Sequence, residues 1–361
     1  MFKKKKVFIG GEKVIPFSLY FSKRRRDFIS ENKNYYSNYY IDYTFGGYHS
    51  LLAIIEHLKQ KHNSFEILLP SYLCHSVLTP FKQRNVDFFF YKVDGNLDPD
   101  FVDIKAKITK EVRAILFIDY MGKSLKPKVV KYLDYFECNG IEVIQDLVQN
   151  IDIKKEHLYG DFIFNSYRKQ YSFEGSILLS KKPIGILFER GTNYRFIINK
   201  RIGQILRFFY LNLRLFSPKA FLFFIGRAEE CYYSNKIYRL PSESRHLLNR
   251  VDSDGIKIRH QLYYEKLLLE FESYVPEVFR ERSTTFLGFF IQTNRRDEVR
   301  MNLRNSNIFC PIHWLSPSDI GESNFSESHK LSEQALTIPI SDLDESNFEY
   351  LKYNLKKHLT S

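Results

Sequence analysis

A single amine and a single carboxylate stand at the ends of two neighbouring apolar runs of this sequence. Lys169 follows the run 161–166, Asp146 closes the run 141–146, and Arg168 directly precedes the lysine. A cationic neighbour and partial burial both lower the pKa of an amine, which leaves more of it unprotonated and able to react with an aldehyde. The carboxylate has a structural interpretation as well, because acids at strand ends commonly cap helices.

Two further features could bind a ligand. Gly46 and Gly47 stand directly before an expected helix, where free backbone N–H groups and the helix dipole favour a phosphate. Tyr72 and His75 follow the short apolar run 65–70, and their flat rings could cover a planar ligand. A glycine turn and aromatic packing at a strand exit are the structural alternatives for these two features.

Together the four features fit a site for pyridoxal phosphate (PLP). Such a site needs an amine that holds the aldehyde as an imine. It also needs a carboxylate against the ring nitrogen, which keeps that nitrogen protonated so that the ring can take up the electrons of a carbanion. A phosphate cradle and a flat group against the ring face complete the requirements. The sequence therefore suggests PLP as the cofactor, and it shows no cluster that suggests a metal.

The elements that must position these residues follow a regular alternation. Short apolar runs alternate with segments of helical periodicity, which is typical of βαβ units and a mostly parallel sheet. Ligands of such sheets gather at the carboxyl ends of the strands. We expect a helix at 50–62 and strands at 65–70, 86–93, 113–120, 141–146, 161–166 and 176–180.

The pattern changes after residue 190. Long aromatic helices are expected at 195–226 and 257–272, and a strand at 284–293 begins a second alternation. The expected fold class is α/β, with a mostly parallel central sheet, helices on both of its faces and a smaller C-terminal α/β domain. The expected division is an N-terminal arm (1–40), a large PLP-binding domain (41–245) and a small C-terminal domain (246–361).

The order of the motifs resembles the fold-type-I PLP enzymes, in particular the DegT-type nucleotide-sugar aminotransferases. That family carries a glycine turn before a helix, a "P-S-aromatic" strand exit, "[E/Q]-D-x-x-[Q/H]" and a lysine loop closing with "E-G-G". This chain reads "FGGYHSLL", "LPSYLCHS", "IQDLVQN" and "SYRKQYSFEGS" in the same order. The likeness runs from about residue 8 to the C-terminus and is weakest over 185–245.

The resemblance implies a role for each matching position. Lys169 would form the Schiff base with the cofactor, and Asp146 would contact the pyridine nitrogen. Gln149 would reach the phenolic oxygen of the ring. The remaining cofactor contacts implied are Gly46, Gly47, Tyr48 and Ser166 at the phosphate, and Tyr72 or His75 on the ring face.

The chain departs from the family pattern at several positions. The usual stacking aromatic falls at Cys74, so Tyr72 or His75 would have to replace it. Ser166 precedes the lysine by three residues, where many members have five. "EGS" replaces "EGG", and Asp119 stands where many relatives have histidine.

By resemblance, the expected activity is PLP-dependent transfer of an amino group from an amino acid such as glutamate to a keto sugar. The sugar would be nucleotide-linked, and the pathway would build surface polysaccharide or amino sugars. A homodimer is implied in the same way. His313 and Trp314 either pack within the small domain or line the substrate entrance. Arg195, Arg201 and Arg250 are candidates for the donor carboxylate.

Two alternatives remain. The first is a PLP-dependent lyase or dehydratase, although sugar dehydration in this family depends on a histidine in place of the cofactor lysine. The second is a catalytically degenerate protein that keeps the fold, which the unusual "FIDY" and "EGS" segments and the absent stacking aromatic motivate.

Composition limits the other possibilities. The chain has 361 residues and a net charge of +12, with basic residues scattered and no recognisable nucleic-acid module, so an anionic small molecule is the expected partner. Its four cysteines lie far apart, which argues against a zinc site or a disulfide framework. Within the aromatic stretch 195–226, charges and a proline interrupt the most apolar part, 205–226, which should not span a bilayer. We interpret that stretch as a core and dimer-contact helix, with a membrane-surface or lipid-linked-substrate role as the alternative, and expect a cytoplasmic protein.

Overall fold

A seven-stranded sheet forms the centre of the computed structural model, which describes residues 7–150, 153–281, 286–341 and 343–359. The strand order is β2-β8-β7-β6-β5-β3-β4, and β8 is antiparallel to both of its neighbours while the other pairs are parallel. The strands are β2 Tyr40–Thr44, β3 Glu66–Pro70, β4 Asp87–Tyr91, β5 Val112–Ile118, β6 Glu142–Asp146, β7 Phe162–Phe164 and β8 Ser176–Ser180. The predicted α/β class with a mostly parallel sheet is confirmed.

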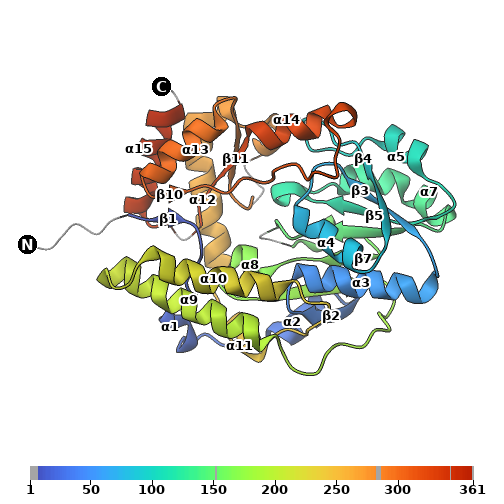
Figure 1. Cartoon of the computed structure of the whole chain (residues 1–361), viewed down its shortest axis with the longest axis horizontal. Coiled ribbons are helices and arrows are strands. Elements are labelled where there is room, and N and C mark those ends of the chain that lie inside the picture. Colours follow the sequence, from blue (N-terminus) through green and yellow to red (C-terminus); the bar gives the residue numbers. More distant parts are fainter. Residues whose placement is uncertain (1–6, 151–152, 282–285, 342, 360–361) are drawn as a thin grey trace, which may run out of the picture.

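Helices cover the sheet, so its inner strands are buried on both faces rather than alternating between buried and exposed positions. The helix α3 packs against β7 and β8, α4 and α5 pack against β4, and α7 packs against β6 (Figure 1). These helices and their short neighbours are α3 Gly47–Lys61, α4 His75–Gln83, α5 Phe101–Lys107, α6 Lys126–Val129, α7 Leu133–Cys138 and α8 Tyr167–Gln170.

Two small sheets lie outside the central one. β9 (Phe289–Gln292) pairs antiparallel with β11 (Ala335–Ile338), and β1 (Ile9–Gly10) pairs parallel with β10 (Ile308–Phe309). Residues near the N-terminus thus join a strand from the C-terminal third. The accompanying helices are α1 Phe17–Tyr20, α2 Phe28–Tyr35, α11 Ser242–Leu248, α12 Ser253–Phe271, α13 Arg296–Asn305, α14 Ser326–Gln334 and α15 Glu345–Leu359. The domain boundaries remain predictions.

The prediction of one helix over 195–226 was wrong. The chain forms two helices, α9 (Tyr194–Leu213) and α10 (Pro218–Tyr232), which pack together as a hairpin (Figure 1). Arg214 adopts a left-handed conformation with φ of 59°, which ends α9, and Pro218 then begins α10, where its missing N–H costs nothing. The helical periodicity continues through both helices, and it therefore concealed the turn.

The other long elements follow the sequence more closely. The helix expected at 257–272 begins earlier, at Ser253, because the Asp252 side chain accepts a hydrogen bond from Gly255 N at 3.2 Å and caps it. Of the strand expected at 284–293, β9 covers the second half, and residues 284 and 285 lie outside the described residues. No helix among the described residues combines the length and the apolar character that crossing a bilayer requires.

Candidate functional site

The ends of four strands bring most of the predicted residues to one edge of the central sheet. Thr44 at the end of β2 pairs with Ser176, and Phe164 at the end of β7 pairs with Asp146 at the end of β6. Because β2, β3, β6 and β7 run in the same direction, the segments that follow them leave the sheet on the same side. These segments hold Gly46, Gly47 and Tyr48, then Tyr72, then Asp146 and Gln149, and finally Ser166 and Lys169.

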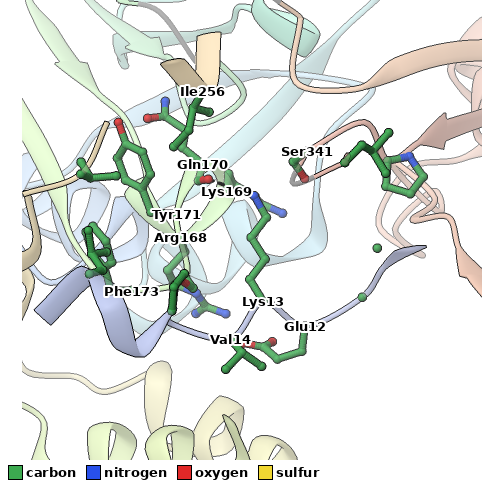
Figure 2. Close-up of a pocket in the computed structure, with 18 of the residues that line it drawn as sticks. Glu12, Lys13, Val14, Arg168, Lys169, Gln170, Tyr171, Phe173, Ile256 and Ser341 are labelled. Carbon is green, nitrogen blue, oxygen red and sulfur yellow. Dashed lines mark hydrogen bonds between the residues drawn. The ribbon is translucent and has the colours of Figure 1, made fainter. Parts of the chain in front are cut away.

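Lys169 lies in α8, within the lysine loop (residues 165–175), and its side chain is accessible from a cavity of about 930 Å³ (Figure 2). Desolvation by the surrounding protein lowers the pKa of this amine, and the charge of Arg168 acts in the same direction. The charges of Glu229 and Asp146 partly oppose the shift. A larger fraction of this amine is therefore unprotonated than in an ordinary lysine, which is the property expected of an imine-forming residue.

Contacts on both sides hold the lysine loop. Arg168 pairs with Glu229 of α10 at 2.7 Å, and its guanidinium lies 4.3 Å from the centre of the Tyr232 ring. The buried Glu174 pairs with Arg201 of α9 at 2.8 Å. The loop conformation is thus determined by helices α9 and α10 as well as by its own strands.

The "EGS" ending of the loop follows from local packing. Gly175 has φ of 139°, and a Cβ there would meet Leu240 and Tyr167, so this position requires glycine. Ser176 replaces the second glycine of the family pattern. Its hydroxyl lies 2.9 Å from that of Ser50 in α3 and is well accommodated.

Asp146 is buried, and burial raises the pKa of its carboxyl to about 7, although the Val148 N–H and the charge of Lys169 lower it. The Val148 N–H donates to one carboxylate oxygen at 2.7 Å. Among the described residues no side chain donates to the other oxygen. A protonated ring nitrogen would supply such a donor and would favour the ionised carboxylate.

Gln149 provides the clearest unsatisfied group of the site. Its Oε1 accepts a hydrogen bond from Met121 N at 2.8 Å, which orients the amide. Its Nε2 is buried and has no partner among the described residues. A buried donor without an acceptor is unfavourable, so this nitrogen fits a bound group that presents an oxygen, as the ring hydroxyl of PLP would.

The beginning of α3 fits a phosphate. Among the described residues nothing accepts from the backbone N–H groups of Gly47 and Tyr48, and the Ser166 hydroxyl likewise has no partner there. Close neighbours account for the two glycines. A Cβ at Gly46 would collide with the Tyr232 hydroxyl, and one at Gly47 would lie 3.1 Å from the Asn165 carbonyl oxygen. A charged phosphate would satisfy these donors.

The three candidates for the ring face differ in position. The buried Tyr72 donates its hydroxyl hydrogen bond to the His313 carbonyl and packs 5.5 Å from Trp314, centroid to centroid. His75 is exposed at the start of α4. Cys74 is half-buried and directly precedes α4. The identity of the ring-face residue remains a prediction.

His313 is part of the cavity wall. Its Nδ1 lies 2.8 Å from Thr337 Oγ1, and burial together with the charge of Lys169 lowers the pKa of its imidazole to about 3, so the ring is neutral. Trp314 packs beside it, against Tyr72, and does not line the cavity.

The cavity adjoins Lys169 but not the whole predicted site. Of the predicted cofactor and substrate residues, Lys169 and His313 line it, as does the donor-carboxylate candidate Arg250, and the others lie outside its wall. Lys169 therefore stands between Asp146 and an open space. Basic side chains outnumber acidic ones in the wall: Lys13, Arg24, Arg168, Lys169, Lys200, Arg207, Arg250 and Arg259 against Glu12, Glu174 and Asp252.

Sequence reasoning missed the N-terminal segment of this wall. Lys13 donates from Nζ to the Gln170 carbonyl at 2.9 Å and crosses the front of the lysine loop (Figure 2). Lys200 of α9 pairs with Glu12 at 3.0 Å. No local signal predicts these contacts, because the partners are far apart in the sequence. Of the arginines considered for a donor carboxylate, Arg250 lines the cavity, whereas Arg201 is engaged with Glu174 and Glu243 and Arg195 is exposed.

Asp119 is a buried neighbour of Asp146 and contacts β6 through hydrogen bonds. Its backbone N–H donates to the Asp146 carbonyl at 3.0 Å, and its carboxylate accepts from Tyr159 at 3.0 Å and Gln145 at 3.2 Å. Burial raises the pKa of its carboxyl to about 7 despite these donors. The residue is enclosed in the sheet, so it can position β6 but does not reach the cavity.

No family model and no curated protein matches the chain. Solved structures match over nearly its whole length. A DegT DnrJ EryC1 StrS aminotransferase from Brucella abortus is 14% identical with a TM-score of 0.60, covering 91% of this chain and 88% of that one. Spr1654 from Streptococcus pneumoniae, in its PMP form, is 11% identical with a TM-score of 0.65 and coverages of 97% and 98%. The dehydratase ColD with bound GDP-perosamine is 12% identical with a TM-score of 0.64 and coverages of 96% and 100%. At such low identities the structural similarity establishes the fold alone, and this fold is the predicted one.

Proposed function

We propose that the protein is a PLP-dependent aminotransferase that moves an amino group from an amino acid to a keto sugar. The proposal rests on one observation above all: Lys169, with its lowered pKa, and the buried Asp146 follow adjacent strands at one edge of the sheet, where their charges interact. The solved structures of the same fold include aminotransferases, one structure in a PMP form and a dehydratase with a GDP-sugar bound.

The residues fit the cofactor at each of its polar groups. When bound, PLP supplies an aldehyde carbon for a covalent bond and a ring that accepts electrons. Lys169 Nζ would form that bond, and as a free amine it would hold and move a proton beside the substrate. Asp146 would keep the ring nitrogen protonated, and Gln149 Nε2 would donate to the ring oxygen. The N–H groups of Gly47 and Tyr48 and the Ser166 hydroxyl would hold the phosphate.

The cavity suits an anionic acceptor. Its volume of about 930 Å³ lies near the upper end of common ligand sites and its wall is mainly basic, which fits a nucleotide-linked sugar. Glutamate is the proposed donor, with Arg250 as the candidate for its carboxylate. A homodimer in the cytoplasm, acting in surface-polysaccharide or amino-sugar biosynthesis, completes the proposal.

The covalent bond provides the most direct test. Purified protein is incubated with PLP, reduced with borohydride and digested, and the labelled peptide is identified by mass spectrometry. We expect the label on Lys169, and we expect Lys169→Ala to lose both the label and turnover. The exposed Lys182 serves as the matched control, and Lys182→Ala should keep both. Labelling elsewhere, or turnover by Lys169→Ala, would refute the assignment.

A second assay separates transfer from elimination. With an amino acid but no sugar acceptor, an aminotransferase completes one half-reaction and stops, so keto acid accumulates only to the amount of enzyme. Continued release of ammonia or keto acid under the same conditions would identify a lyase instead.

A further inference from the structure

The turn of the α9–α10 hairpin exposes apolar side chains that the fold does not cover. Every residue of 213–219, which we call the hairpin tip, is exposed. Leu213, Leu215 and Phe216 are 57%, 51% and 59% exposed. Figure 1 shows this turn at the left edge of the molecule, away from the central sheet. Apolar side chains continue along the outer faces of the two helices, with Ile205, Phe208, Leu222 and Phe223 also exposed.

The same hairpin concentrates positive charge. Residues 190–228 contain eight basic side chains and no acidic one, and the two acidic residues of the hairpin, Glu229 and Glu230, follow at the far end of α10. Lys200, Arg201 and Arg207 are used internally, in contacts with Glu12, Glu174 and the Gly10 carbonyl. Five others are exposed and pair with no carboxylate of the described residues: Arg190, Arg195, Arg214, Lys219 and Arg227.

Exposed leucine and phenylalanine interleaved with unpaired cations match an element that lies in a lipid headgroup layer. Because the hairpin does not cross a bilayer, insertion would be limited to its tip. We propose that the α9–α10 hairpin docks the protein on an anionic membrane surface, with Leu215 and Phe216 inserted and Arg214 and Lys219 at the lipid phosphates.

Charge favours this occupant over a second copy of the chain. A two-fold contact would place the same patch on both partners and bring its arginines close to one another. The chain has fewer acidic than basic residues, 42 against 54. The two acidic residues of the hairpin, Glu229 and Glu230, lie at the end of α10 away from the tip, and Glu229 is already paired with Arg168. An anionic leaflet supplies the missing countercharge, and each cation near it strengthens binding roughly fivefold.

Docking through the tip would determine how far the cavity lies from the membrane surface. Leu211, two residues before the tip, lines the cavity, as do Lys200 and Arg207 from the same helix. A protein held by its tip would therefore keep one side of the cavity close to the lipid surface.

Vesicle flotation with the full-length protein tests the proposal. Vesicles are made of phosphatidylcholine alone or of phosphatidylcholine mixed with phosphatidylglycerol. We expect binding to the mixed vesicles, weakening as salt is raised because the charges are screened. Absence of binding to the mixed vesicles, or equal binding to both kinds, would overturn the proposal.

Matched variants locate the contact. Leu215→Ser with Phe216→Ser should weaken binding at least roughly tenfold, and Arg214→Glu with Lys219→Glu should weaken it roughly 25-fold or more at two cations. The controls are Leu269→Ser, a leucine on α12 that is 71% exposed, and Lys131→Glu, an exposed lysine far from the hairpin in sequence. Equal losses in tip and control variants would overturn the proposal.

Two further measurements distinguish membrane docking from self-association and from a loss of folding. If the tip variants change the protein from dimer to monomer in size-exclusion chromatography and vesicle binding is absent, the tip is a contact between copies and the proposal fails. Circular dichroism of each variant verifies that an effect on binding is not a loss of folding. Lys169→Ala should still bind vesicles, so failure of the proposed enzymatic function leaves this test intact.

Discussion

The lysine loop and the hairpin tip differ in whether their charged side chains have partners within the molecule. In the loop, Arg168 and Glu174 are each paired with a charge from another part of the chain. In the tip, Arg214 and Lys219 have no carboxylate partner among the described residues, and Phe216 is open to solvent. The loop conformation is therefore determined by contacts inside the molecule. The side chains of the tip have no comparable contacts among the described residues and are available to a partner outside it.

The two regions are nevertheless joined by the same pair of helices. Glu229, which pairs with Arg168, and Arg201, which pairs with Glu174, lie in the inner parts of α10 and α9. The inner part of the hairpin thus supports the lysine loop, while its outer end makes no such contact. Substitutions should separate the two: changes at the strand ends should affect chemistry and stability, and changes at the tip should affect neither.

Asp146→Asn should produce the largest effect. An amide does not hold the positive charge of a protonated ring nitrogen, so turnover should fall on the order of 10²–10³, as when one preorganised electrostatic contact is removed. The matched variant is Arg214→Glu at the tip, which should turn over a soluble acceptor at the wild-type rate. Steady-state kinetics with saturating PLP measures both. Equal rates for Asp146→Asn and wild type would remove the functional distinction between the regions.

The buried Asp119 gives a pH-dependent effect. Burial raises the pKa of its carboxyl to about 7, above the value of about 4 in an unfolded chain. The folded protein therefore holds a proton that the unfolded chain releases, and its stability falls as pH rises between these two values. Asp119→Asn lacks this titration. Its free energy of unfolding relative to wild type should grow by about 1.4 kcal/mol for each pH unit between 5 and 7.

Urea unfolding of both proteins at pH 5, 6 and 7, without cofactor, measures this difference. Groups that do not interact with Asp119, such as His313, contribute equally in both proteins and cancel, whereas the neighbouring Asp146, whose charge raises the pKa of Asp119, contributes to the measured difference. A constant difference across the range would mean that the Asp119 carboxyl is ionised in the folded protein throughout.

The parts of the fold that could be predicted from the sequence were those with a local signal. The predicted runs 65–70, 113–120 and 141–146 correspond to the strands β3, β5 and β6, although β5 ends at Ile118, because burial on both faces favours apolar residues at most of their positions. Parallel strands share one edge, so the polar residues that follow them had to meet. Lys169 and Asp146 could be selected for that reason, and their roles remain predictions.

The rest depends on contacts between distant parts of the chain. Nothing near Lys13 indicates that it meets Gln170, and nothing near Tyr72 indicates that its hydroxyl bonds to the His313 carbonyl. The break between α9 and α10 had a local signal in Pro218, but an uninterrupted apolar periodicity outweighed it. The unpaired Nε2 of Gln149 is visible only once the position of Met121 is known.

Two glycine-to-alanine substitutions test whether the lysine loop is more tightly packed than the hairpin, because each adds a single methyl group. Gly175 in the lysine loop has φ of 139°, and a Cβ there would lie 2.5 Å from Leu240 Cδ1, so Gly175→Ala should cost about 1–3 kcal/mol of stability. Gly226 in α10 has no atom within 4 Å of such a Cβ. Gly226→Ala should stabilise by about 0.5–1 kcal/mol, because alanine loses less backbone entropy in a helix. Urea midpoints at a common m-value measure both, and effects of the same sign would show that the loop is no more constrained than the hairpin.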